Sequence, residues 1–86
     1  TARALAGVLA DLAATHQVIV VTHLAQVAVM ADKHYVVSKE PGDVPQTHLD
    51  EVTGEARTAE IARMLSGDQS EASLAHAKQM LEEARG

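Results

Sequence analysis

The 86-residue chain contains no cysteine, no phenylalanine and no tryptophan, and Tyr35 is its only aromatic residue. Without cysteine, the chain can form neither a disulfide framework nor a thiolate metal site. The near absence of aromatic side chains argues against a base-stacking surface for single-stranded nucleic acid. No apolar run approaches the roughly 18 residues that a membrane-spanning helix needs, so we expect no membrane partner.

Positive charge and glycine are scarce as well. Seven Lys and Arg residues are outnumbered by 12 Asp and Glu residues, which gives a net charge of −5. The basic residues are scattered, which argues against a free-standing, non-specific nucleic-acid binder. The five glycines are isolated. The chain therefore has neither a Gly-rich phosphate loop nor a nucleophile elbow, and we do not expect it to cradle a nucleoside triphosphate alone.

The apolar content is high but consists of small side chains. Hydrophobic residues make up 47% of the chain, mostly Ala, Val and Leu. A domain of this size buries only a modest fraction of its surface, and small side chains build a thin core. The composition favours a segment that other segments complete over an autonomous domain.

The most informative stretch is residues 18–21, Val-Ile-Val-Val, which ends abruptly at Thr22 and His23. An apolar run without polar alternation is typical of a strand buried on both faces, as in a parallel sheet. Ligands of such sheets bind just beyond the carboxyl ends of the strands. The stretch therefore predicts a buried strand that presents His23 at its end.

The rest of the pattern predicts helices at 2–14, 24–31, 55–66 and from 71 onward, and strands at 35–39 and 46–52. We expect a right-handed parallel crossover between strands 18–21 and 35–39, with strand 46–52 returning antiparallel to the latter. Gly67 should end the third helix in the left-handed conformation, and Ser70 should cap the fourth.

The last helix carries a narrow apolar seam of residues spaced three or four apart: Leu74, Ala77, Leu81 and Ala84. Such a seam packs against another helix. The partner is either another element of this chain or a separate protein, and the sequence leaves both alternatives open.

His23 is the leading candidate for chemistry. A histidine at a strand end can hydrogen-bond a phosphate oxygen or an attacking water. The alternative is a partly buried histidine that satisfies a loop carbonyl. The chain's other histidines have no i, i+4 partner of the kind that forms a helical metal site, so we expect no metal site: they are His16, His34, His48 and His76.

The carboxylates are less informative. Asp11, Asp32 and Asp50 are single acidic residues at expected loop or helix positions, and Glu51 and Glu55 extend a small acidic cluster. The simplest interpretation of all of them is a solvated surface group.

Several segments together carry a resemblance to a known family. Residues 18–23 and 31–39 resemble the switch-histidine segment of ABC-type ATPase heads, including the SMC group. Residues 22–28, Thr-His-Leu-Ala-Gln-Val-Ala, resemble a run of the RecN family of bacterial DNA-repair proteins. Residues 54–57 and 60–67 resemble the C-terminal signature of that family, and the final helix fits its end. The resemblance covers nearly the whole chain.

The resemblance implies an α/β fold, as part of a P-loop ABC- or SMC-type ATPase head. Such a part has a few-stranded mixed sheet flanked by helices and is incomplete without the N-terminal lobe. Residues 1–67 would be the C-terminal lobe portion with the switch-histidine loop, and residues 68–86 a C-terminal helix that packs on the head. His23 would be the catalytic switch histidine and would contact the γ-phosphate of ATP.

The implied function is ATP hydrolysis in the recombinational repair of DNA double-strand breaks. ATP and Mg²⁺ would be bound by the complete head, and this segment alone would be inactive. The implied partners are the N-terminal lobe, a second head in an ATP-sandwiched dimer, and DNA. The implied location is the bacterial cytoplasm, at the nucleoid.

The chain also departs from the family pattern. Ala25 stands where the family usually has proline, which should loosen the start of the following helix. The Walker A loop, the Walker B acid, the signature motif and the coiled coil are absent, and Gln26 matches the family run without an assigned role. Two alternatives stay open: a non-catalytic interaction module that uses the seam, and the equivalent segment of another SMC-like or ABC-type ATPase.

Overall fold

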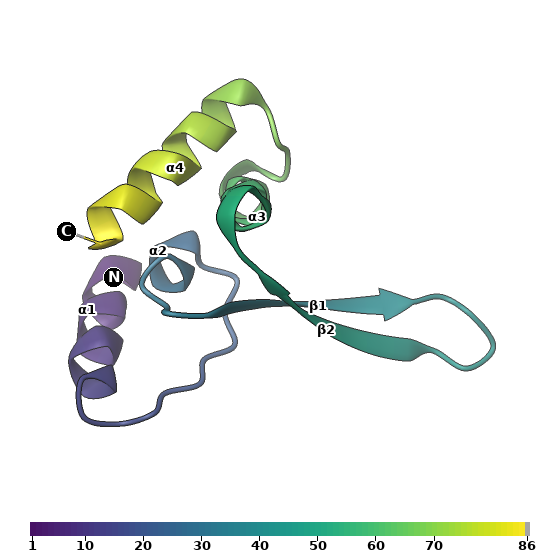
Figure 1. Ribbon diagram of the computed structural model, residues 1–86, viewed down its shortest axis with the longest axis horizontal. Helices are drawn as coiled ribbons and strands as arrows, with labels where there is room; N and C mark the ends of the chain where they lie inside the picture. The colour runs from purple at the N-terminus through teal and green to yellow at the C-terminus, as the bar shows by residue number, and fades with distance from the viewer. Residues whose placement is uncertain (86) are drawn as a thin grey trace.

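The computed structural model describes residues 1–85, which form four helices and one β-hairpin (Figure 1). In chain order the elements are α1 (Ala2–Ala13), α2 (Ala25–Ala28), β1 (His34–Glu40), β2 (Gln46–Val52), α3 (Gly54–Ser66) and α4 (Glu71–Arg85). The chain is thus a small mixed α/β unit whose described part has a single two-stranded antiparallel sheet.

The hairpin follows the predicted pairing. Strands β1 and β2 run antiparallel, from the pair His34–Val52 at the base to the pair Glu40–Gln46 near the tip. Figure 1 shows the hairpin projecting away from the helices, and only its base contacts them. The predicted antiparallel return of residues 46–52 is therefore confirmed.

Local sequence signals set the ends of α3 and α4. Gly67 adopts a left-handed φ of 77° after α3, and its N–H donates to the carbonyl of Arg63 at 2.7 Å. The Ser70 hydroxyl accepts the N–H of Ser73 at 3.3 Å, in the first turn of α4. Both predicted boundaries are confirmed, because each depends on chemistry within a few residues.

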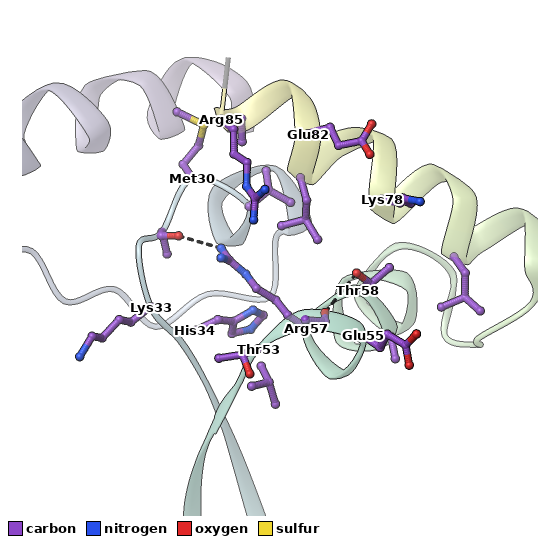
Figure 2. A pocket seen from close by; sticks show the side chains of 18 of the residues that line it. Met30, Lys33, His34, Thr53, Glu55, Arg57, Thr58, Lys78, Glu82 and Arg85 are labelled. Carbon is purple, nitrogen blue, oxygen red and sulfur yellow. Dashed lines mark hydrogen bonds between the residues drawn. The ribbon is translucent and has the colours of Figure 1, made fainter.

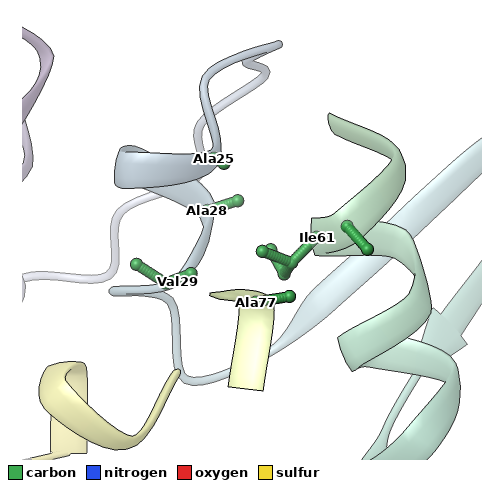
Figure 3. Packing of buried hydrophobic residues seen from close by; sticks show 6 residues of the cluster. Ala25, Ala28, Val29, Ile61 and Ala77 are labelled. Carbon is green, nitrogen blue, oxygen red and sulfur yellow. The ribbon is translucent and has the colours of Figure 1, made fainter. Parts of the chain in front are cut away.

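The core lies where α2, α3 and α4 meet (Figure 3). Ile61 on α3 and Ala77 on α4 are fully buried, and small residues of α2 pack around them. The rest of the α4 seam lies half-buried on this cluster: Leu74, Leu81 and Ala84. The seam therefore packs largely within the chain.

The predicted strand at residues 18–21 is wrong for this structure. These residues connect α1 to α2 without forming a strand, and Ile19 and Val21 are 86% and 98% exposed. A strand exists only as part of a hydrogen-bonded ladder, and none of the described residues pairs with this segment. The predicted parallel crossover is absent from the described residues for the same reason, and the helix predicted at 24–31 shortens to α2.

Helix α1 forms as predicted but leaves its apolar side open. The Thr1 hydroxyl accepts the N–H of Ala4 at 3.2 Å and caps the helix. Within α1 only Ala6 is buried, whereas Leu5, Val8 and Leu12 are about half exposed or more. Within residues 1–85, none of the helices is long and apolar enough to cross a bilayer.

Candidate functional site

His23 lies in the turn that leads into α2. The Thr22 hydroxyl accepts the N–H of Leu24 at 3.0 Å, which closes a tight turn around His23. The side chain of Thr22 is half-buried, whereas His23 is exposed, and no described residue hydrogen-bonds its ring. The alternative of a partly buried histidine that satisfies a loop carbonyl is therefore not what the structure shows. An exposed imidazole at this position is free to meet a ligand.

The turn at the far end of α2 is held by Arg57 of α3. One terminal nitrogen of its guanidinium donates to the carbonyl of Ala28 at 3.2 Å and to the carbonyl of Ala31 at 2.7 Å. Burial and then the nearby Arg85 lower the pKa of Arg57, while Asp32 opposes that shift. Figure 2 shows the Arg85 side chain approaching the Arg57 guanidinium from α4.

His34, the first residue of β1, lies beside Arg57 at the base of the hairpin (Figure 2). Burial and then the positive charge of Arg57 lower the pKa of His34, while Glu60 raises it. Two buried nitrogens here have no hydrogen-bond partner among residues 1–85, namely His34 Nδ1 and Arg57 Nε. Arg57 therefore donates hydrogen bonds to two carbonyls of the α2 turn, while its Nε has no partner among residues 1–85.

The other polar residues singled out from the sequence are dispersed. His48 pairs with Glu40 at 3.0 Å on the exposed hairpin, and His16 bonds the neighbouring hydroxyl of Thr15 at 2.8 Å. His76 lies exposed on α4. The acidic residues predicted to be solvated are exposed: Asp11, Asp32, Asp50, Glu51 and Glu55.

The described residues do not form a metal centre. Within residues 1–85, no three His, Asp or Glu side chains lie close enough together to hold a metal ion.

Comparison with known proteins gives consistent matches. The chain is 52% identical over 79 residues to the DNA repair protein RecN of Deinococcus radiodurans, and 48% identical over 83 residues to that of Treponema pallidum. A more distant RecN, from Halalkalibacterium halodurans, is 38% identical over 83 residues. The chain is similar to a segment of RecN. The predicted resemblance is thereby confirmed.

The RecN matches cover 91% to 94% of this chain but only 14% to 15% of each relative. The chain thus spans about a seventh of the RecN proteins that it matches, as expected for a C-terminal RecN segment. No family model matches it.

The sequence pattern singled out His23 as a candidate but did not indicate that Arg57 and His34 lie side by side. Arg57 stood inside the RecN-like signature, yet nothing in its neighbours indicated its hydrogen-bond partners. Those partners lie 26 and 29 residues earlier in the chain. The sequence shows only that Arg57 is a basic residue near the start of α3, and basic residues at such positions are usually exposed to solvent.

Proposed function

We propose that this chain is the C-terminal part of the ATP-binding and hydrolysing head of a RecN-like protein that acts in recombinational repair of DNA double-strand breaks. The observation that carries the proposal is the similarity to RecN over 91% of the chain, at 52% identity. Among the segments that carried the resemblance, residues 22–28 include His23 and residues 54–57 include Arg57.

The exposed apolar surface supports the proposal independently. Ile19 and Val21 are almost fully exposed, and the apolar residues of α1 also face solvent. Soluble proteins rarely leave a large apolar surface uncovered unless it contacts something else. In a P-loop head, residues 18–21 would be an inner strand of a larger sheet, and that sheet would cover them.

His23 would act at the carboxyl end of that strand. Its exposed ring could donate a hydrogen bond to the γ-phosphate of ATP and help to orient the attacking water. Phosphoryl transfer depends on positioning and charge stabilisation more than on covalent chemistry, so one well-placed donor is enough for this role. The phosphate loop and the acidic residue that acts on water would lie outside this chain.

The other proposed partners follow from the same assignment. They are the N-terminal lobe of the head, a second head across the nucleotide, and DNA. Residues 1–67 would belong to the lobe and residues 68–86 would form a helix packed on it. The alternative is an interaction module that uses the α4 seam; it would have only the half-buried seam residues to offer a partner, because Ala77 is fully buried inside the chain.

The test uses a hybrid RecN, defined as D. radiodurans RecN in which this chain replaces the matching 79-residue segment. In the hybrid, His23→Ala should lower the kcat of ATP hydrolysis about 100-fold, the usual effect of removing a donor that stabilises a transition state. The matched control is His76→Ala, which removes an exposed histidine from α4 and should leave kcat unchanged. Unchanged turnover and unchanged head dimerisation in the His23 variant would disprove the catalytic role.

A further inference from the structure

Helix α2, which follows His23, is a single turn of four residues, Ala25–Ala28. A helix this short is not stable by itself in water, because nucleation fixes several residues for each hydrogen bond gained. Its position therefore depends on contacts with the rest of the molecule. Ala25 and Ala28 are 3% and 7% exposed and belong to the same buried cluster as Ile61 of α3.

Arg57 supplies the polar contact at the C-terminal end of α2. Its guanidinium donates to the carbonyls of Ala28 and Ala31 at 3.2 and 2.7 Å. The last carbonyls of a helix have no partner inside the helix, and a cation at that end is also favoured by the helix dipole. Arg57 therefore adds a polar link between α3 and the C-terminal end of α2, next to the apolar contacts of Ala28 in the buried cluster.

Short-range hydrogen bonds connect α2 to His23 at the other end. The Thr22 hydroxyl accepts the N–H of Leu24, and the carbonyl of Leu24 accepts the N–H groups of Val27 and Ala28, both at 3.1 Å. His23 lies inside this bonded stretch. A displacement of α2 would consequently move the backbone of His23 with it.

We propose that Arg57 is a positioning residue for His23: it holds α2 against α3 and thereby sets where the imidazole is presented. The proposal rests on the proposed function, because the placement of His23 affects turnover only if His23 meets the nucleotide. Arg57 itself bonds two backbone carbonyls and acts on the reaction through His23 alone. Misplacing a reacting group by about 1 Å can reduce a rate by up to about 100-fold, so this kind of support is measurable.

The structural part is tested in the hybrid RecN by amide hydrogen exchange. Arg57→Met keeps the apolar stem but removes both hydrogen bonds, and it should speed exchange at Val27, Ala28 and Val29 at least about tenfold relative to amides of α3. Arg63→Met is the matched control on the same helix, because Arg63 is exposed and pairs with Glu60 within α3. Equal α2 exchange in the two variants would overturn the proposed anchoring.

The functional part is tested in the hybrid RecN. Arg57→Met should lower kcat about tenfold with KM nearly unchanged, and Arg57→Lys, which keeps the cation, should restore part of the loss. The decisive measurement is a double-mutant cycle with His23→Ala. If Arg57 acts through His23, then Arg57→Met should have no further effect on kcat in the His23→Ala background.

The outcomes separate the two proposals. If Arg57→Met lowers kcat equally with and without His23, Arg57 acts independently of His23 and the positioning role is wrong. If His23→Ala leaves turnover unchanged, the proposed function fails, and the positioning role fails with it even where the exchange data show that Arg57 anchors α2. If Arg57→Met prevents the hybrid from folding, Arg57→Lys takes its place in the cycle.

Discussion

His34 and Arg57 show how one side chain can depend on a distant part of the sequence. The imidazole starts β1, and the guanidinium beside it comes from α3, 23 positions later. Burial of His34 Nδ1 and the charge of Arg57 both oppose protonation of the ring. Nothing near His34 in the sequence indicates this environment, because the strand pairing and the start of α3 create it.

This environment predicts a pH-dependent stability. The pKa of His34 is lowered from its ordinary value of 6.5, by burial first and by Arg57 second, with Glu60 opposing. The unfolded chain therefore binds more protons than the folded chain below about pH 6.5, so the free energy of unfolding should fall as the pH falls through that range. Urea unfolding between about pH 7.5 and 5.5 measures the slope.

The control for this prediction is His34→Gln, which should flatten the slope in that window, compared with His76→Gln, which should not. The carboxyls of Glu60 and Asp68 have lowered pKa values, held down chiefly by Arg63 and by the Ser70 backbone respectively. The stability that these two carboxylates contribute is present above their ordinary pKa values of 4.5 and 3.8 and is lost at lower pH. That loss therefore falls below the range from about pH 7.5 to about 5.5 in which the slope is measured. An unaltered slope in His34→Gln would contradict the prediction.

At the scale of elements, prediction succeeded where the determining signals were local. The hairpin, α3 and α4 formed at the predicted places, because turn residues, Gly67 and Ser70 act within a few positions. Residues 18–21 have equally clear strand composition but form no strand here. Their β-branched side chains favour a buried strand. A strand also needs a neighbouring strand to pair with, and none of the described residues pairs with this segment.

The packing of α3 against α4 and α2 predicts the effect of trimming the core. Ile61 is fully buried, so Ile61→Val should lower the free energy of unfolding by about 0.5–1.5 kcal/mol through lost contacts and a small cavity. Val44 near the hairpin tip is 78% exposed, and Val44→Ala should change the free energy of unfolding by no more than about 0.5 kcal/mol. Urea unfolding measures both; equal losses would show that the three helices do not share one core.

At the scale of the whole molecule, many large apolar side chains stay exposed beside a small buried core. The buried cluster consists of small residues around Ile61, while Val8, Ile19 and Val21 are each more than half exposed. This imbalance agrees with the expectation of a thin core drawn from composition. It also agrees with a chain that spans 14% of its D. radiodurans relative.

The exposed segment gives a prediction that compares two contexts. In the chain itself, Val21→Asn should change the free energy of unfolding by less than about 0.5 kcal/mol, because Val21 is 98% exposed. In the hybrid RecN, the same change should destabilise the head by about 1–3 kcal/mol, since an amide would replace a buried side chain. Thermal unfolding of both proteins, with Val44→Asn as control, makes the comparison. A small effect in both contexts would mean that residues 18–21 stay exposed.

The residue pattern alone was enough to predict the boundaries of the last two helices, the antiparallel hairpin and the resemblance to RecN. These features depend on spacing and on capping chemistry over a few residues. Three features became visible only in the folded molecule: Ile19 and Val21 are uncovered, the α4 seam packs on the buried cluster, and Arg57 bonds the end of α2. The reason is physical: burial and long-range hydrogen bonds depend on which segments meet in space, and composition does not specify that meeting.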